Sequence, residues 1–285
     1  MGRMTGALLV LAPLLAIGAV LAAGEILSAA APAAIGDAPA DLHATTVRIA
    51  VRDGFVAGWL VRGRPRQGAV LLMHGVRSNR LQMLPRARFL AAQGYTVLLI
   101  DLPSHGESSG SRITFGAREQ EGAGAALAFL AQQCPDERIG VIGVSLGAAA
   151  LVLAQPQPAP AAVVLESMYP TIGEAVANRL QMRLGAAGRW LAPILVLQLP
   201  LRAGVSAAQL RPVDDAAALR CPVLVISGAA DVQTTAAETR RIHAALPGPK
   251  QLWLLDGAAH VDLHAFAPAE YEKRVGAFLA QYLGR

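Results

Sequence analysis

The sequence predicts an α/β fold in which a mostly parallel central sheet carries helices on both faces and a helical cap is inserted into the chain. Short, continuous aliphatic runs alternate with helix-like stretches from about residue 45 onwards, which is the order of elements in parallel βαβ units. The runs have no polar face, as expected of strands buried on both sides. One interval of 56 residues, between Leu165 and Pro222, is far longer than an ordinary connection.

The elements follow from these patterns in chain order. Asp53-Gly54 is a hairpin turn signal, so we expect a hairpin of Thr45–Val51 and Phe55–Val61. The buried strands are predicted at Ala69–Met73, Thr96–Ile100, Ile139–Val144, Ala161–Leu165, Pro222–Ser227 and Gln251–Leu255. The helices are predicted at Leu81–Gln93, Ala117–Gln132, Leu146–Ala154, Thr235–Leu246 and Pro268–Tyr282.

The long interval predicts the cap, at about residues 169–211 of a domain that spans residues 45–285. Glu174–Leu184 has apolar residues at helical spacing, and Trp190–Leu201 is apolar but interrupted by two prolines. The apolar stretch suits a place over a binding pocket or against a membrane. The cap arginines Arg179, Arg183 and Arg189 either meet an anionic head group or are solvated, and the sequence does not distinguish these roles.

The composition excludes several classes of protein. With 54% hydrophobic and 16% charged residues, the chain is neither disordered nor fibrous. The 25 basic residues exceed the 20 acidic ones, but they form no stripe with interleaved aromatic residues, so we expect no nucleic-acid partner. Cys134 and Cys221 fit neither a disulfide framework nor a metal site and are interpreted as small packing residues.

The N-terminus carries 21 uncharged residues between Arg3 and Glu25. This length matches a bilayer, so residues 1–27 are predicted to be a transmembrane anchor, with a cleaved secretory signal as the alternative. The charge of Arg3 places the start in the cytoplasm. We therefore expect a membrane-anchored protein with its domain on the extracytoplasmic side, or a secreted or periplasmic one after cleavage. Residues 28–44 are predicted to be an Ala/Pro-rich linker.

The motif Gly143-Val-Ser145-Leu-Gly147 lies between a predicted strand and a predicted helix. In that context the pattern G-x-S-x-G forms a sharp turn that lifts the serine hydroxyl clear of the sheet. Ser145 is therefore the candidate nucleophile. The backbone amides of Leu146 and of Val76, which follows the strand ending at Met73, are the candidate oxyanion donors.

A serine nucleophile needs a base and an orienting carboxylate. Asp231 and His260 each follow a predicted strand, and parallel strands place such loops at one edge of the sheet, so both are expected near Ser145. Glu166 is the alternative acid. The other competitors are His264 as base and Asp262 as acid. His74 is interpreted as structural, and the segment from Asp101 to Ser108 as a polar scaffold for neighbouring loops.

Taken together, His74 to Asn79, Asp101 to Ser108, the G-x-S-x-G motif, Leu165 to Ser167 and His260 resemble the α/β-hydrolase superfamily, most closely its BEM46/ABHD13-type branch of membrane-anchored serine hydrolases. The resemblance implies the α/β-hydrolase fold, a Ser145/Asp231/His260 triad, an oxyanion hole from Val76 and Leu146, and ester hydrolysis without metal or organic cofactor. Pro103-Ser104 departs from the Arg-Gly that relatives often carry before His-Gly.

The leading hypothesis is thus a serine hydrolase of carboxylic esters, with lipid or lysophospholipid-like esters as a candidate class and the membrane as a partner. Two alternatives remain. A serine peptidase of the aminopeptidase kind would need acidic cap residues to hold a substrate amine, and Glu174 is the only carboxylate between Thr171 and Arg211. A membrane-tethered binding module without activity would keep the fold, although nothing in the sequence breaks the triad.

Overall fold

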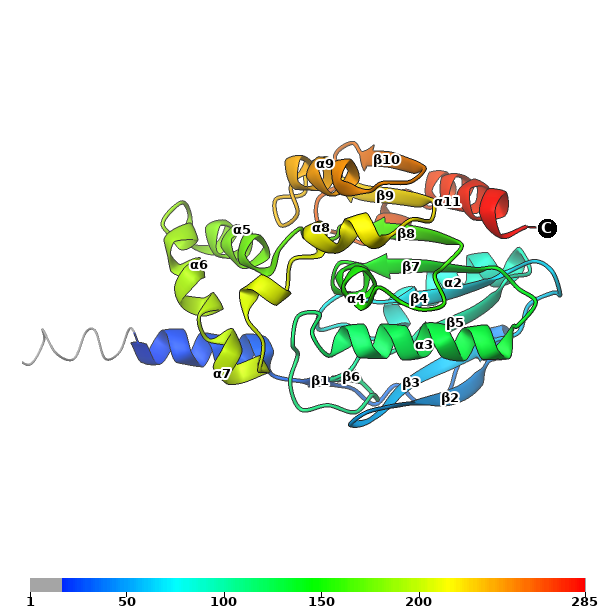
Figure 1. Ribbon diagram of the computed structural model, residues 1–285, viewed down its shortest axis with the longest axis horizontal. Coiled ribbons are helices and arrows are strands. Elements are labelled where there is room, and N and C mark those ends of the chain that lie inside the picture. Colours follow the sequence, from blue (N-terminus) through cyan, green and yellow to red (C-terminus); the bar gives the residue numbers. More distant parts are fainter. Residues whose placement is uncertain (1–16, 285) are drawn as a thin grey trace, which may run out of the picture.

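The computed structural model describes residues 17–284, which are built around a sheet of eight strands in the order β10-β9-β8-β7-β4-β5-β3-β2 (Figure 1). The strands are β2 (Thr45–Val51), β3 (Gly54–Val61), β4 (Ala69–Met73), β5 (Thr96–Ile100), β7 (Ile139–Val144), β8 (Ala162–Glu166), β9 (Val223–Gly228) and β10 (Lys250–Leu255). All neighbours pair in parallel except around β3, which is antiparallel to both β2 and β5. The predicted α/β fold is confirmed, and each predicted strand end lies within one residue of the observed one.

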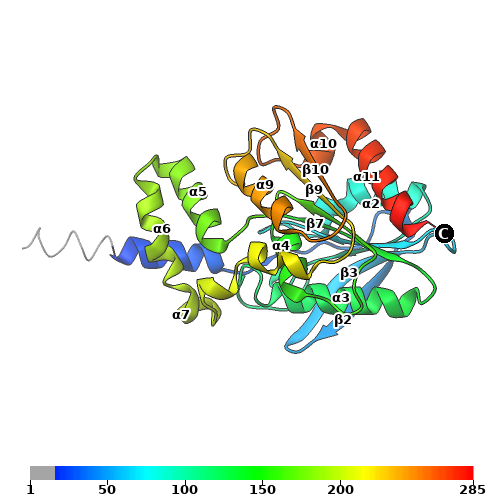
Figure 2. The ribbon, with the colours of Figure 1, turned by 45° about the horizontal axis from the view of Figure 1, so that its top comes forward.

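Helices cover both faces of the sheet, as predicted. One face carries α3 (Glu119–Gln133), α4 (Leu146–Ala154) and α9 (Ala236–Ala245), and the other carries α2 (Leu84–Ala92) and α11 (Pro268–Leu283) (Figures 1 and 2). Successive residues of β4 alternate between the two hydrophobic cores, with Leu71 in one and Leu72 in the other. This alternation follows from the two-residue period of a strand, and it explains why these strands are apolar throughout.

The chain reverses its direction of travel across the sheet at β4, which lies between β5 and β7. Ligands of open α/β sheets bind beyond the carboxyl ends of the strands at such a switch point. The loop that begins at His74 follows β4, and the turn at Ser145 follows β7, its direct neighbour. The topology therefore brings these two loops together.

A buried ion pair braces the loops at this edge. The Asp101 carboxylate, at the end of β5, accepts hydrogen bonds from the backbone amides of Arg80 (2.7 Å) and Glu107 (2.9 Å) and pairs with the Arg80 guanidinium. That guanidinium is fully buried, also pairs with Glu107 and lies 4.5 Å from the centroid of the Trp59 ring. Buried charges are tolerated when they are paired in this way.

Two buried histidines fix the loop after β4. His74 donates from Nδ1 to the Gly75 carbonyl (2.7 Å), and its Nε2 accepts from the Leu102 amide (3.0 Å). Nε2 of His105 accepts from the Arg77 amide (3.0 Å). Burial, reinforced by the charge that His105 can carry, lowers the pKa of His74 to about 3. His74 is therefore a neutral structural group, as its sequence position suggested.

Between β8 and β9 the chain forms the helices α5 (Ile172–Leu184), α6 (Gly188–Val196) and α7 (Leu199–Ala203), which together are the cap helices. They lie beyond the carboxyl ends of the strands, away from the sheet (Figures 1 and 2). Thr171 begins α5 by accepting a hydrogen bond from the Glu174 amide. Short helices α8 (Pro212–Asp215) and α10 (Leu263–Phe266), which the sequence analysis did not predict, complete the connections to β9 and α11.

The predicted membrane anchor and the membrane-anchored localisation are corrected by the structure. Among residues 17–284, no helix is long and apolar enough to cross a membrane. The described part of this segment, residues 17–28, is helical. It lies against α7, where Gln198 donates to the Val20 carbonyl (3.0 Å) and Arg202 pairs with Glu25. Residues 1–16 of the predicted anchor lie outside the described residues.

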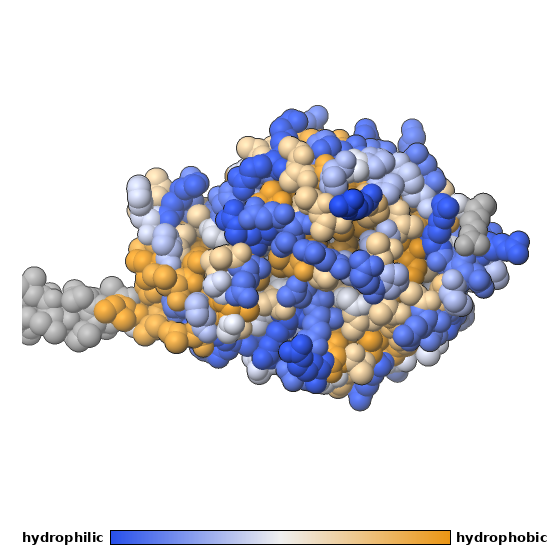
Figure 3. All heavy atoms as spheres, viewed as in Figure 1, coloured by the Kyte–Doolittle hydropathy of each residue, from blue (hydrophilic) through white to orange (hydrophobic). Residues whose placement is uncertain are grey.

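The segment predicted as a linker takes part in the fold at two places. The short strand β1 (Ala31–Pro32) pairs in parallel with β6 (His105–Gly106), and Leu42 is buried. Apolar side chains are exposed over the cap helices and the segment 17–28, where hydrophobic atoms gather on the surface (Figure 3). The most exposed are Leu201 (90%) and Trp190 (83%).

Truncating the core should destabilise the protein far more than truncating the cap surface. Leu71 is fully buried in β4, so Leu71→Ala leaves a cavity and should lower the free energy of unfolding by about 2–5 kcal/mol. Leu201→Ala removes the same atoms from an exposed site and should change it by less than about 0.5 kcal/mol. Denaturant unfolding measures both, and equal losses would contradict the proposed location of the core.

Burial of neutral His74 should make the protein less stable in acid. The unfolded chain binds a proton at His74 near the ordinary pKa of 6.5, whereas the folded protein does so only near 3. This contribution is fully present above pH 6.5 and is lost as the pH falls through 3, by about 5 kcal/mol in all. In urea titrations between pH 7 and 3, His74→Gln should lose stability less steeply than the parent.

The exposed His43 supplies the control for that substitution. His43→Gln should keep the free energy of unfolding within about 0.5 kcal/mol of the parent at pH 7. Parallel pH profiles for the parent and His74→Gln would contradict the account of His74.

Candidate active site

Ser145 lies at the sharp turn from β7 into α4, and its backbone is strained. Its φ of 48° falls in the left-handed region, which is uncommon for a residue with a side chain. The two glycines of the motif allow the turn: a Cβ on Gly143 would lie 2.6 Å from the Ala148 amide nitrogen, and one on Gly147 would lie 2.6 Å from the Met73 carbonyl. The local sequence thus produces the turn expected of G-x-S-x-G.

Ser145 opens onto a cavity of about 480 Å³ between the sheet edge and α5. Val76 and Leu146 line the same cavity. Within the described residues, neither of their backbone amides donates a hydrogen bond. The Val76–Arg77 stretch is held by the bond from the Arg77 amide to His105. Ser145, Val76 and Leu146 therefore share one cavity.

His260 and Asp231 are brought together although 29 residues separate them in the chain. His260 Nδ1 lies 2.7 Å from Asp231 Oδ2. The other carboxylate oxygen of Asp231 accepts from the backbone amides of Gln233 (2.7 Å) and Thr234 (2.9 Å). Asp231 is buried, whereas the His260 side chain is 20% exposed. The carboxylate is thus fixed in orientation, and the imidazole remains accessible.

The competing acids and base have other partners. The buried Glu166 carboxylate pairs with the Arg86 guanidinium (2.7 Å) and accepts from the Tyr271 hydroxyl. Asp262 accepts from Arg86 (2.9 Å) and from the Ala265 amide, at the start of α10. His264 lies 3.0 Å from the carboxylate of Glu272. Arg86 thus joins Glu166, Tyr271 and Asp262 in one largely buried polar network.

The Ser145 hydroxyl makes no hydrogen bond to the His260 ring within the described chain, so the sequence-predicted residues are assembled as an Asp231–His260 pair and a separate serine.

Among residues 17–284, no group of three His, Cys, Asp or Glu side chains is placed to hold a metal ion. Cys134 is buried in the core and Cys221 is partly buried, and both are free thiols.

The cavity wall is mainly apolar but contains charged side chains of one sign. Ile172, Val176 and Leu180 come from one face of α5, and Arg179 lies on the same face. Burial lowers the pKa of the Arg179 guanidinium, an effect that the charge of Asp231 opposes in part. Burial also raises the pKa of the Tyr169 hydroxyl, which donates to the Phe115 carbonyl (2.9 Å).

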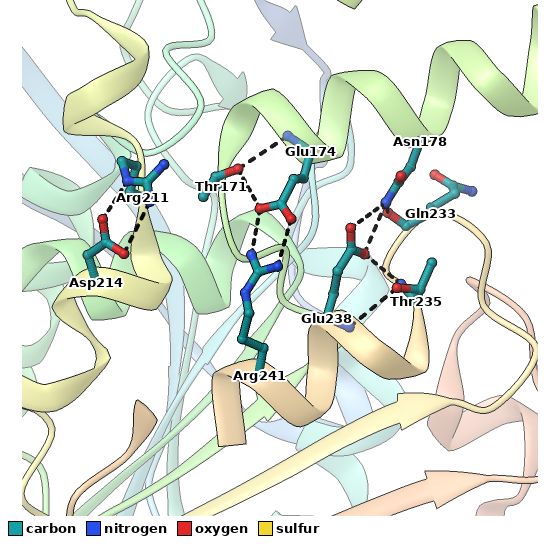
Figure 4. A network of polar contacts seen from close by, with 9 residues as sticks. All are labelled: Thr171, Glu174, Asn178, Arg211, Asp214, Gln233, Thr235, Glu238 and Arg241. Carbon is teal, nitrogen blue, oxygen red and sulfur yellow. Dashed lines mark hydrogen bonds and ion pairs between the residues drawn. The ribbon is translucent and has the colours of Figure 1, made fainter. Parts of the chain in front are cut away.

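Polar contacts tie α5 to α9 and so fix this wall of the cavity (Figure 4). Glu174 accepts two hydrogen bonds from the Arg241 guanidinium (2.9 and 2.7 Å). One turn further along α5, the Asn178 amide donates to both oxygens of the Glu238 carboxylate (2.8 and 3.0 Å). Because α9 packs against the core through Ile242, these contacts fix α5 relative to the body of the protein.

Sequence reasoning missed one part of the site. Ala23, Ile26 and Leu27, from the helical segment 17–28, also line the cavity. The Arg77 guanidinium donates to the carbonyls of Ile26 (2.9 Å) and Ala29 (3.3 Å) at the end of that helix. The only signal in the sequence was the continuous apolarity of the segment, which suits a bilayer and a cavity wall equally.

Comparisons with known proteins agree with the fold. Residues 69–274 match the family model described as the alpha/beta hydrolase family. The uncharacterized protein YqkD of Bacillus subtilis is 26% identical over 228 residues, which cover 79% of this chain and 75% of that protein. An uncharacterized protein of Mycobacterium tuberculosis is 31% identical over 196 residues, or 68% of this chain and 63% of that protein.

Among solved structures, the esterase Pf2001 of Pyrococcus furiosus is similar with a TM-score of 0.76 and 25% sequence identity, covering 90% of this chain and 99% of that one. The strand order, the turn at Ser145 and the family match all agree. The chain therefore belongs to the alpha/beta hydrolase family, and its fold is that of an ester-hydrolysing enzyme.

Proposed function

We propose that the protein is a serine esterase in which Ser145 is the nucleophile, His260 the general base and Asp231 the residue that orients His260. The observation that carries this proposal is the 2.7 Å contact between His260 Nδ1 and Asp231 Oδ2 at the sheet edge where Ser145 lies. A carboxylate on Nδ1 keeps the proton there and leaves Nε2 free to accept one.

In the first half of the proposed reaction, the Ser145 oxygen attacks the ester carbonyl carbon while His260 Nε2 takes the hydroxyl proton. The tetrahedral intermediate collapses when the C–O bond to the alcohol breaks and His260 returns the proton to the leaving oxygen. In the second half, water attacks the acyl-Ser145 ester with His260 again as base, and the free acid leaves. The Ser145–His260 hydrogen bond that the chain lacks is one that commonly forms only with substrate bound.

The amides of Val76 and Leu146 are the proposed oxyanion donors. Both line the cavity with Ser145, and both lack a described partner, so they are free to bind a developing negative charge. His105 and Gly75 fix the Val76 loop, and α4 fixes Leu146. Donors that are held in place before the reaction need no reorganisation during it, which is the main source of this kind of stabilisation.

The cavity supports an ester with an apolar portion as substrate. Its volume of about 480 Å³ and its lining from α5 suit an acyl chain or a similar apolar group, so lipid or lysophospholipid-like esters are the class we propose. The name of the Pf2001 esterase supports ester chemistry, and the motif resemblance to the BEM46/ABHD13-type branch supports a serine mechanism.

Ser145→Ala should abolish activity. We expect kcat/KM for 4-nitrophenyl hexanoate to fall by about 10⁴- to 10⁶-fold, because the nucleophile is lost, and covalent labelling by a fluorophosphonate probe to disappear. Ser111→Ala, at an exposed serine, is the matched control and should behave as the parent. Labelling that persists in Ser145→Ala would reject the nucleophile, and a folded parent that is never labelled would favour a binding module. Faster cleavage of aminoacyl amides than of esters would favour a peptidase.

Asp231→Asn should separate the two candidate acids. Asparagine keeps an oxygen for the Gln233 and Thr234 amides but favours the wrong tautomer of His260, so kcat should fall by about 10³- to 10⁴-fold with little change in stability. Glu166→Gln leaves Arg86 without its buried partner and should mainly lower the free energy of unfolding, by about 3–5 kcal/mol. A larger loss of kcat in Glu166→Gln than in Asp231→Asn would reverse the assignment.

A further inference from the structure

Three arginines line the cavity, namely Arg77, Arg179 and Arg183, and none of its described lining residues is an aspartate or a glutamate. Substrate cavities that are mainly apolar contain few charged groups, and those that occur usually determine orientation and specificity. The described lining therefore carries positive charge that no acidic lining residue balances, and an anionic ligand would balance it.

Of these three arginines, Arg179 is partly buried and has no anionic partner among the described residues. Arg77 already holds the end of the helical segment 17–28, and Arg183 is exposed. Arg179 donates a single hydrogen bond, to the Ala175 carbonyl of its own helix (3.2 Å). Among residues 17–284 it has no carboxylate within ion-pair distance, and residues 1–16 contain no acidic side chain.

An arginine that lines an apolar cavity and keeps most of its N–H donors unpaired is suited to bind an anion. A guanidinium has five N–H donors and binds carboxylate or phosphate through two of them at once. Arg179 is partly buried, and burial lowers its pKa. An anionic ligand would stabilise its charge and accept hydrogen bonds from its remaining N–H donors.

The position of Arg179 is fixed before any ligand arrives. It is the neighbour of Asn178, whose amide is bound by Glu238, and it lies just over one turn from Glu174, which is bound by Arg241 (Figure 4). These ties hold α5 against α9, so Arg179 stays on the cavity side of the helix. Preorganisation of this kind lowers the entropic cost of binding.

We propose that Arg179, assisted by Arg183 at the rim, forms an anion-binding subsite and that the substrates are apolar esters that also carry a carboxylate or a phosphate. This inference rests on the proposed esterase function and defines its substrate class. The apolar portion of the substrate packs against the wall formed by α5 and the segment 17–28. Its ester group lies at Ser145, and its anionic group pairs with Arg179.

A matched pair of esters tests the subsite. 4-Nitrophenyl hydrogen suberate carries a free carboxylate, and in its methyl ester a methyl group replaces that charge at nearly the same chain length. The parent should have the higher kcat/KM for the charged ester, chiefly through a lower KM. In Arg179→Gln the ratio of the two kcat/KM values should fall by about 10- to 100-fold, the usual effect of losing a hydrogen bond to a charged group. Arg179→Lys should restore part of the ratio.

Arg189→Gln is the matched control, because Arg189 lies in α6 and its guanidinium bonds to Gln181 away from the cavity lining. It should leave the ratio within twofold of the parent, and thermal unfolding should show that all variants are folded. An unchanged ratio in Arg179→Gln, or a parent that prefers the neutral ester, would overturn the subsite while leaving the esterase proposal intact.

A binding measurement keeps the test independent of turnover. Calorimetric titration of Ser145→Ala with octyl phosphate, octanoate and octanol should show tighter binding of the anions, and adding Arg179→Gln should weaken the anions at least tenfold relative to octanol. Preference for octyl phosphate would identify a phosphate-bearing substrate and preference for octanoate a carboxylate-bearing one. Equal binding of all three would reject the subsite, even if no ester were ever hydrolysed.

Discussion

The close packing of β7 and α4 at Ser145 is the constraint on which the rest of the site depends. A left-handed φ at a residue with a side chain costs on the order of 1–3 kcal/mol, and the turn persists because Gly143 and Gly147 let the helix start directly against β7 and the end of β4. The same contact places Ser145 beside the loop of Val76. Any side chain at either glycine would separate the hydroxyl from the proposed oxyanion donors.

Around this turn, polar groups are buried in pairs that position loops. Asp101 and Arg80 brace the loop after β5, and Arg86 joins Glu166 to Asp262 beneath the loop of His260. Such pairs are poor sources of net stability, because desolvation offsets much of their attraction. Their effect here is geometric. They fix the loops that carry Val76 and His260 relative to the sheet, so the proposed catalytic groups are held in place by the protein itself.

The cap helices complete the cavity but are held to the core by only a few polar contacts. They bury little of themselves, as the exposed Trp190 and Leu201 show, and depend on a few contacts with the core, of which Glu174–Arg241 and Asn178–Glu238 are the firmest. The wall opposite comes from the helical segment 17–28, attached through Glu25 and Arg77. The lining of the cavity therefore comes largely from segments outside the sheet.

Apolar patterning was sufficient to predict the sheet, its covering helices and the loops that carry Ser145, Asp231 and His260, because buried parallel strands are continuous apolar runs and their carboxyl ends meet at one edge. The same pattern left Asp231 and Glu166 as rival partners of His260, since both follow strands at that edge. Contacts between distant parts of the chain distinguish them: Glu166 is surrounded by Arg86 and Tyr271, whereas Asp231 lies against His260. Such contacts also place segment 17–28, because an apolar helix buries equally well in lipid or against a cap, and no local pattern records which surface it meets.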